Sequence, residues 1–362
     1  MRFFLKRGPL IGVSVASESS LPIMLSRWEN GGVEVTEPGY RKLFREFYGR
    51  ANEELGFPPE LESESVEELR NRLVVARSVD RDTLDMFQRQ VNDLRSSDQR
   101  FGAVVVLDQL NQLVRQMESI RSFSVSTRHR QQLARTLTDA RTLAGWTALD
   151  RGSQLQAWQY HEDAKVSAME ADSPQLLAHA AAQQAVILLD MGEPVLAVEL
   201  LEFARGVAEK RVPPLLGAWL AAAHGEGLAA AGRHDESLRA FDEAQVMLPA
   251  NPVDPEMPFL LLNDGQLTRW RGSALVRLGN PDSINQLESE VKDLESPDNW
   301  AIRGQTNMYV DLAFAYAAAG DSKGALKYAR LARQLASRIG SERQRQRLVN
   351  LELPGVGSAG IA

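Results

Sequence analysis

The 362-residue sequence contains no cysteine, which excludes disulfide bonds, thiolate nucleophiles, iron–sulfur clusters and cysteine-ligated zinc. Aromatic residues make up only 7% of the chain, while Leu and Ala recur throughout, and this balance favours helix over strand. Neither sign of charge dominates, because 41 basic and 48 acidic residues leave a net charge of −7. The chain is therefore no polycation that coats nucleic acid, and any nucleic-acid contact is expected to be local.

Long hydrophobic runs are missing as well. The most apolar stretch, residues 214–232, is interrupted by His224 and Glu226, whereas a membrane-spanning helix needs about 20 mostly apolar residues. Basic residues near the N-terminus precede an apolar run at residues 10–16, but this run is short and contains Gly12 and Ser14, unlike a secretion signal. We expect a cytoplasmic protein that makes no membrane contact.

The signatures of common enzyme sites are absent too. The five histidines form no pair at metal-binding helical spacing, and the sequence has no His-Glu-x-x-His string, no Gly-x-x-x-x-Gly-Lys phosphate loop and no nucleophile elbow. The His161-Glu162-Asp163 string could bind a metal only with ligands from elsewhere, and we expect an exposed helix face there. The sequence thus predicts no enzyme, no metal site and no cofactor.

The distribution of proline marks the organisation of the chain. No proline lies between Pro59 and Pro174, and this stretch is rich in Leu, Arg, Gln and Asp, so we expect consecutive long helices. The preceding residues 58–65 are acidic and marked by Pro and Ser, as in a linker. This divides the chain into an N-terminal module (1–57), a linker (58–65) and a helical connector or degenerate repeat (66–132), followed by the repeats.

Five glycines recur at nearly regular intervals after the connector. Gly152, Gly192, Gly232, Gly279 and Gly320 are separated by 40, 40, 47 and 41 residues, with a small residue seven positions before each. Glycine tolerates the left-handed conformation that ends a helix, and a small residue lets a partner helix approach closely. We therefore expect antiparallel helix pairs. The 47-residue interval contains a proline-rich insertion at residues 249–258, which we expect to be non-helical.

The pattern resembles tetratricopeptide (TPR) repeats. The best-matching unit runs from Trp219 to Pro249 and carries the motif's residues Gly225, Leu228, Gly232, Phe241 and Ala244. The resemblance covers residues 133–348 and leaves residues 349–362 as a flexible tail. The resulting fold class is all-α, with a TPR-like α-solenoid of antiparallel helix pairs behind a partial helix-turn-helix module.

The TPR resemblance also implies a ligand groove, lined by residues at fixed positions before each turn glycine. The candidate residues there are Trp146, His179, Trp219, Glu226, Arg269, Asn307 and Phe314. The tryptophans would stack on a ligand, Glu226 and Arg269 would bind its two termini, and Asn307 would bind its backbone. In the alternative, Trp219 packs between repeats and Glu226 pairs directly with Arg269. A basic run near the C-terminus favours a solvated helix end (Arg338, Arg343, Arg345 and Arg347).

The string Ser26-Arg27-Trp28-Glu29-Asn30-Gly31 resembles the end of the recognition helix in Xre/Cro-type helix-turn-helix proteins. The resemblance implies that Trp28 packs in a small core and that Glu29 forms an ion pair with a neighbouring helix. In that family the recognition helix enters the major groove of DNA. The candidate DNA-binding residues are Pro22, Ile23, Ser26, Arg27 and Asn30.

The module departs from that family in two ways. The family has two helices before the recognition helix, but only about 20 residues precede Leu21 here, and these contain Gly8, Pro9 and Gly12 and show no helical period. Residues 1–57 also hold eight basic and seven acidic residues, so their attraction to phosphate is small. We expect either that upstream sequence is missing or that the module is vestigial.

Two functional hypotheses follow. In the first, the protein is a DNA-binding transcriptional regulator whose TPR-like domain binds a peptide or protein ligand and mediates homodimerisation, with promoter DNA as its other partner. In the second, it is an interaction scaffold that does not bind DNA and whose N-terminal module is vestigial. The sequence supports no enzymatic alternative.

Overall fold

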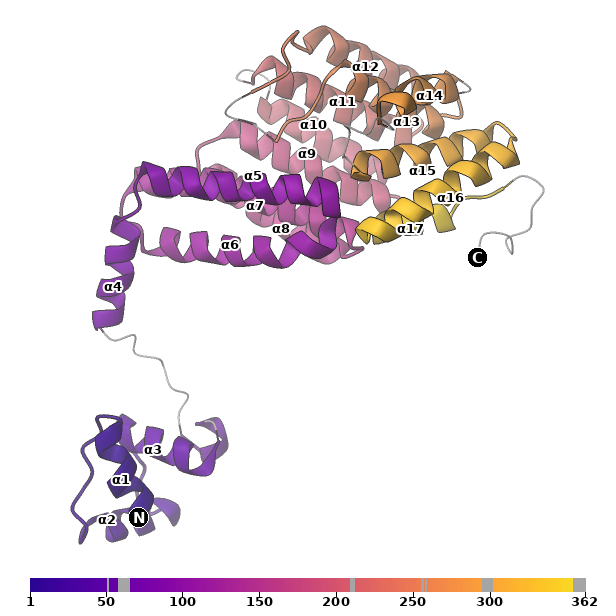
Figure 1. The fold of residues 1–362 in the computed structure, drawn as a ribbon. Helices are drawn as coiled ribbons and strands as arrows, with labels where there is room; N and C mark the ends of the chain where they lie inside the picture. Colours follow the sequence, from indigo (N-terminus) through magenta and orange to yellow (C-terminus); the bar gives the residue numbers. More distant parts are fainter. Residues whose placement is uncertain are drawn as a thin grey trace. The chain divides into compact units, whose positions relative to one another are not determined.

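A computed structural model describes residues 1–50, 52–57, 66–208, 212–254, 257, 259–280, 282–294 and 302–353. Within these ranges the chain forms 17 α-helices, one short 3-10 helix and no strand, which confirms the all-α prediction (Figure 1). The chain divides into two compact units, Met1–Asn71 and Arg72–Ala362. The linker expected at 58–65 lies outside the described residues.

The first unit is built on an aromatic core. It contains α1 (Arg2–Leu10), α2 (Leu21–Glu29), α3 (Pro38–Tyr48) and a 3-10 helix (Glu53–Leu55), and α4 (Val66–Arg77) begins in it. The fully or nearly fully buried side chains are Phe4, Leu21, Leu25, Val35, Tyr40, Leu43 and Phe44. The Phe4 ring lies 5.1 Å from the Phe44 ring, edge to face, so α1 is fixed against α3.

Helix α1 corrects the expectation that no helix precedes Leu21. It forms although Gly8 and Pro9 lie near its end, because Phe4 is buried and offsets their poor helix propensity. Packing requires glycine at position 8, because a Cβ there would lie 2.1 Å from Cγ2 of Val15. One helix thus precedes α2, where the helix-turn-helix resemblance implies two.

The second unit consists of consecutive helix pairs (Figure 1). Its helices are α5 (Arg81–Phe101), α6 (Ala103–Phe123), α7 (Thr127–Asp150), α8 (Gln154–Glu170), α9 (Pro174–Asp190), α10 (Pro194–Ala208), α11 (Pro214–Ala230), α12 (His234–Met247), α13 (Asp264–Arg277), α14 (Asp282–Leu294), α15 (Ile302–Ala318), α16 (Ser322–Ile339) and α17 (Glu342–Val349). The most extensive contacts are within the pairs α7–α8, α9–α10, α11–α12 and α15–α16. This arrangement fits a helical solenoid.

The repeat glycines occupy the expected turns. All five have positive φ, between 66° and 81°, which places them in the left-handed region. The small residues before the turns allow the expected close approach: a Cβ at Gly225 would lie 2.8 Å from the Phe241 ring, and one at Gly145 would lie 2.6 Å from Nε2 of His161. Sequence spacing therefore located both the turns and a close approach of the two helices in these pairs.

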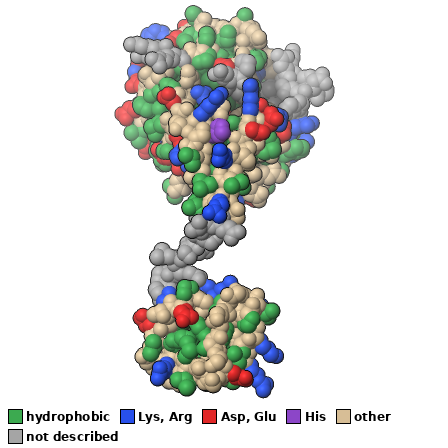
Figure 2. Space-filling model, turned by 90° about the vertical axis from the view of Figure 1, so that its left-hand side faces the viewer, with side chains coloured by type: hydrophobic (Ala, Val, Ile, Leu, Met, Phe, Trp, Pro, Cys, Tyr) green, Lys and Arg blue, Asp and Glu red, His purple; other side chains and the backbone are tan. Residues whose placement is uncertain are grey.

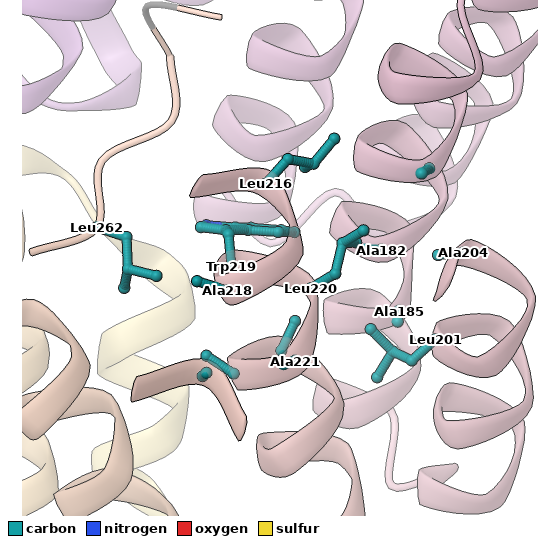
Figure 3. Close-up of a cluster of buried hydrophobic side chains, with 14 of the residues drawn as sticks. Ala182, Ala185, Leu201, Ala204, Leu216, Ala218, Trp219, Leu220, Ala221 and Leu262 are labelled. Carbon is teal, nitrogen blue, oxygen red and sulfur yellow. The ribbon is translucent and has the colours of Figure 1, made fainter. Parts of the chain in front are cut away.

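Small and large side chains alternate in the core between pairs. Figure 3 shows Ala182 and Ala185 of α9 beside Leu220 of α11 and Leu201 of α10, and all four are at most 2% exposed. Alanine on one helix lets leucine on the next fill the space between the axes. Neighbouring pairs are thereby packed into one continuous core around Trp219.

The segment between α12 and α13 is an extended strap rather than a helix, as expected for the described part of residues 249–258. It is nevertheless packed, because Met257, Leu260 and Leu262 are buried in the same core as Trp219. Figure 3 shows Leu262 directed toward the helix that carries Trp219. The strap therefore covers helix α11 and brings Phe259 to the inner side of the unit.

The first and last helices of this unit meet, so that the solenoid closes into a ring. Helix α5 contacts α15 and α16, and α7 contacts α17. The approach is close, because a Cβ at Gly102 would lie 2.1 Å from the carbonyl oxygen of Ile339 and one at Gly340 would lie 2.4 Å from Cγ2 of Val104. We call this contact, between α5–α7 and α15–α17, the seam.

The first residues of the predicted flexible tail are packed against the core. Helix α17 ends at Val349, and the next residues fold back, so that Leu351 and Leu353 are buried in the core beside α15 and α16. Burial of these two leucines fixes residues 350–353, contrary to the expectation. Residues 354–362 lie outside the described residues.

Candidate functional site

The second unit encloses a central cavity of about 470 Å³, a size typical of ligand pockets. Its lining comes almost entirely from the first helix of each pair, namely α5, α7, α9, α11, α13 and α15, with α17 and the strap completing the wall. Side chains at the inner face of each first helix are directed to this one space because the helices stand side by side around the ring. The cavity is thus a product of the repeat architecture.

The structure brings most of the predicted groove residues together. Six of the seven line the cavity, and Phe314 instead packs against the core of α15 and α16. The six are Trp146, His179, Trp219, Glu226, Arg269 and Asn307. Their shared location does not depend on any single repeat, because they come from five different helices.

One side of the cavity is aromatic. The Trp219 ring lies 4.9 Å from the His179 ring and 5.6 Å from the Trp270 ring, and Phe259 of the strap lies 4.6 Å from His179. Trp219 is only 9% exposed, so it both packs between helices and faces the cavity. Burial lowers the pKa of His179 to about 3, which keeps this ring neutral at pH 7.

Glu226 and Arg269 do not pair with each other. The Glu226 carboxylate accepts a 2.6 Å hydrogen bond from Nε1 of Trp270 and lies 3.6 Å from Arg277, whereas Arg269 lies 3.4 Å from Glu290. The direct pair considered from the sequence is therefore wrong. Glu226 instead fixes the orientation of the Trp270 ring.

The other side of the cavity is formed by arginines that also hold the seam. Arg303 of α15 lies between two buried carboxylates, at 2.6 Å from Asp98 and 2.9 Å from Asp150. Arg343 of α17 forms a bidentate pair with Asp190, and both guanidinium groups stand over Trp146, at 5.9 and 5.3 Å from its ring centre. Cation–π and ion-pair contacts thus join the two ends of the ring.

The prediction that the C-terminal basic run is a solvated helix end is wrong for Arg343 and Arg347, whereas Arg338 and Arg345 are exposed as predicted. The side chain of Arg343 is 11% exposed, and Arg347 pairs with Asp311 at 2.7 Å. Arg343 and Arg347 are four residues apart on α17, so both lie on the inner face of this helix. The spacing can be seen in the sequence, but the carboxylates with which the two arginines pair cannot. Arg303 likewise lies one helical turn before the predicted Asn307 and was missed.

A buried histidine corrects another expectation. His161 is 1% exposed, rather than on an exposed helix face, and neither ring nitrogen has a hydrogen-bond partner. Burial lowers its pKa to about 3. Within the described ranges, no three His, Asp or Glu side chains are grouped so that they could hold a metal ion.

The predicted DNA-binding residues lie in the first unit, on and just after α2. Pro22, Ile23, Ser26, Arg27 and Asn30 are all exposed, while the opposite face of this helix is buried in the aromatic core. The amide of Asn30 donates a 2.6 Å hydrogen bond to the carbonyl of Ser26, so this side chain closes the end of its own helix.

The neighbours of the α2 tip partly match the expectations. Trp28 packs on Tyr40, with ring centres 4.7 Å apart, as expected. Glu29 accepts a 3.0 Å hydrogen bond from the Tyr48 hydroxyl of α3, where an ion pair was expected. A phenol in place of a cation still connects the two helices.

None of the helices in the described part of the chain is both long enough and apolar enough to cross a membrane. No protein-family model matches the sequence, and no curated protein matches it significantly.

Proposed function

We propose that the protein is a DNA-binding transcriptional regulator, cytoplasmic and homodimeric, whose ring-shaped second unit senses a short peptide. The observation that carries this proposal is the pairing of two features in one chain: a small unit whose helix α2 exposes the candidate DNA-binding residues, and a built cavity lined by six of the predicted groove residues. Each feature was expected from a different resemblance, the first Xre/Cro-like and the second TPR-like.

Support for DNA binding comes from the division of α2 into two faces. Leu21 and Leu25 are buried and anchor the helix, so Ile23, Ser26 and Arg27 are held outward on a rigid support. A helix anchored in this way can enter the major groove with its exposed residues near base edges and phosphates. The cation among them is Arg27.

Support for ligand sensing comes from the cavity's mixed lining. Aromatic walls and a few fixed polar groups are the usual composition of a small-ligand site. In the proposed mechanism, peptide binding favours one state of the ring, and this population shift changes how a dimer places its two α2 helices.

The direct test is titration of labelled promoter fragments, including the protein's own promoter, with the full chain at several salt concentrations. We expect binding that weakens steeply with salt, and Arg27→Ala should lower the slope of log K against log salt by about 1 if Arg27 contacts a phosphate. Lys6→Ala, an exposed cation on α1, is the matched control and should leave the slope unchanged. Absence of any complex at low salt would rule out the DNA-binding half of the proposal.

A second candidate function, a scaffold that does not bind DNA, is favoured by one observation. Ile23 is 58% exposed at the centre of the proposed recognition face, an apolar group where hydrogen-bonding side chains usually read bases. Figure 2 shows a face of the first unit where hydrophobic side chains lie among scattered charged ones. Such a surface suits a protein partner better than a polyanion.

A further inference from the structure

The charged residues that line the central cavity are bound to protein partners. Six arginines and four carboxylates are among the described lining residues, and each of them takes part in an ion pair. The contacts are Arg95–Asp139, Arg269–Glu290, Arg277–Glu226, Arg303 with Asp98 and Asp150, Arg343–Asp190 and Arg347–Asp311. An ionic ligand would have to displace one of these partners and leave a charge uncompensated in a largely buried site. The lining therefore favours an uncharged ligand.

Much of the remaining lining is aromatic. Trp219 contacts the rings of His179 and Trp270, and Phe259 of the strap contacts His179, with ring centres 4.6–5.6 Å apart. Trp146 adds a ring from α7, and alanines of α9 and α11 line the space beside these rings. Short side chains leave room next to an aromatic surface, and a planar aromatic molecule gains stacking contacts there that a saturated one lacks. This wall therefore favours a flat, aromatic ligand.

Two uncharged polar groups of the lining are available for hydrogen bonding. Within the part of the chain that the structure describes, the side-chain amides of Gln99 on α5 and Asn307 on α15 have no hydrogen-bond partner. Gln99 follows Asp98, and Asn307 lies one turn after Arg303, so both amides lie near the Asp98–Arg303 pair at the seam. A carboxamide both donates and accepts hydrogen bonds, so two of them suit a ring edge that carries donors as well as acceptors.

We infer that the central cavity binds an uncharged, planar heteroaromatic molecule, which stacks on the aromatic wall and forms hydrogen bonds through its ring edge with Gln99 and Asn307. The volume of about 470 Å³ accommodates a bicyclic or tricyclic ring system. Apolar walls with a few fixed polar groups are the usual way in which a protein orients such a molecule.

This inference goes beyond the proposed function, because it gives the cavity a second class of ligand. A peptide sensed by the same unit keeps its charged ends outside the space between the paired arginines and carboxylates. The two ligand classes therefore differ in a property that can be varied chemically, namely the charge carried into the cavity.

The first experiment compares ring-matched compounds by affinity selection on the full chain and mass spectrometry. One library holds bicyclic and tricyclic heteroaromatic carboxamides, and three others hold the matching carboxylates, the matching aminomethyl compounds and saturated carboxamides of similar size. The chain should retain heteroaromatic carboxamides and bind their carboxylate and ammonium counterparts at least about tenfold more weakly, because these would have to break an ion pair. The saturated carboxamides should bind about fivefold more weakly, because they cannot stack.

The second experiment places the ligand in the cavity by calorimetric titration of variants with the retained carboxamides. Gln99→Ala and Asn307→Ala should each weaken binding about fivefold, because each removes one hydrogen bond. Phe259→Leu keeps an apolar side chain but removes a ring, and should also weaken binding about fivefold. Gln154→Ala removes an exposed amide on the outer helix α8 and is the matched control, with unchanged affinity. Thermal unfolding without ligand checks that each variant is folded.

A random library of free hexapeptides, tested in the same way, separates this inference from the sensor proposal. Retention of peptides but of no heteroaromatic carboxamide would overturn the inference and leave a peptide sensor standing. Equal binding of carboxamides and their charged counterparts, or unchanged affinity in all three cavity variants, would also overturn it. Retention of no compound and no peptide would overturn both proposals. If a variant fails to fold, the comparison of compounds on the unmodified chain still decides.

Discussion

Replacing Gly225 by alanine tests the helix-pair packing most directly. The new Cβ would lie 2.8 Å from two carbons of the Phe241 ring, and that residue is only 1% exposed. Overpacking of this kind costs about 1–3 kcal/mol, while Gly→Ala in a helix returns up to about 1 kcal/mol of propensity. We expect a net loss of about 1 kcal/mol, and Gly225→Leu should lose at least as much.

Gly206 provides the matched control, because it also lies inside a helix but a Cβ there would meet nothing within 4 Å. Gly206→Ala should therefore stabilise the protein by about 0.5–1 kcal/mol. Urea unfolding, followed by the circular dichroism signal of the helices, measures the free energy of unfolding of both variants. The two values can be compared directly when both have the same dependence on urea concentration. If Gly225→Ala is as stable as Gly206→Ala, the proposed contact between α11 and α12 is incorrect.

Three further predictions concern pH, the seam and a helix cap. Burial lowers the pKa of His161 and His179 to about 3, so below pH 6.5 these histidines take up protons in the unfolded chain but not in the folded one. The free energy of unfolding should therefore fall by about 2 kcal/mol per histidine by pH 5. His161→Leu should make the free energy of unfolding depend less on pH, and an unchanged dependence would contradict the burial of His161. Asp190→Ala leaves the Arg343 guanidinium without its carboxylate partner and should destabilise the protein by about 3–5 kcal/mol, as measured by thermal unfolding. Adding Arg343→Met removes the unpaired charge and should restore part of this stability. If it restores none, an unpaired charge is not the cause of the loss. Asn263→Ala removes the capping box of α13 and should cost about 1 kcal/mol in urea unfolding, unless α13 is held by its packing alone.

The parts of the fold that the sequence predicted are those with local causes. A turn glycine is required where the backbone has positive φ, and this requirement holds at Gly152 and Gly320 whatever lies elsewhere in the chain. Inner positions such as Trp146 and Asn307 follow from the same register, because each first helix repeats one orientation. Phe314 shows the limit, since it precedes its turn glycine by six residues, as Trp146 does, but packs against the core of α15 and α16 instead of lining the cavity.

The features that sequence reasoning missed depend on contacts between distant residues. Arg303 and Asp98 are 205 positions apart, and no pattern within a repeat indicates that they meet. Phe259 reaches the cavity from an irregular strap that has no periodicity to interpret. Helix α1 was missed for a related reason: the burial of Phe4 in a tertiary core outweighs the local signals of Gly8 and Pro9.

Ring closure also changes how the repeats depend on one another. In an open array, terminal repeats fray first and need polar outer faces as caps. Here the first and last repeats cap each other, and Ile339, at 1% exposure, would be uncovered by loss of α5. Removing helix α17 should therefore raise hydrogen exchange in α7, at the opposite end of the series of repeats.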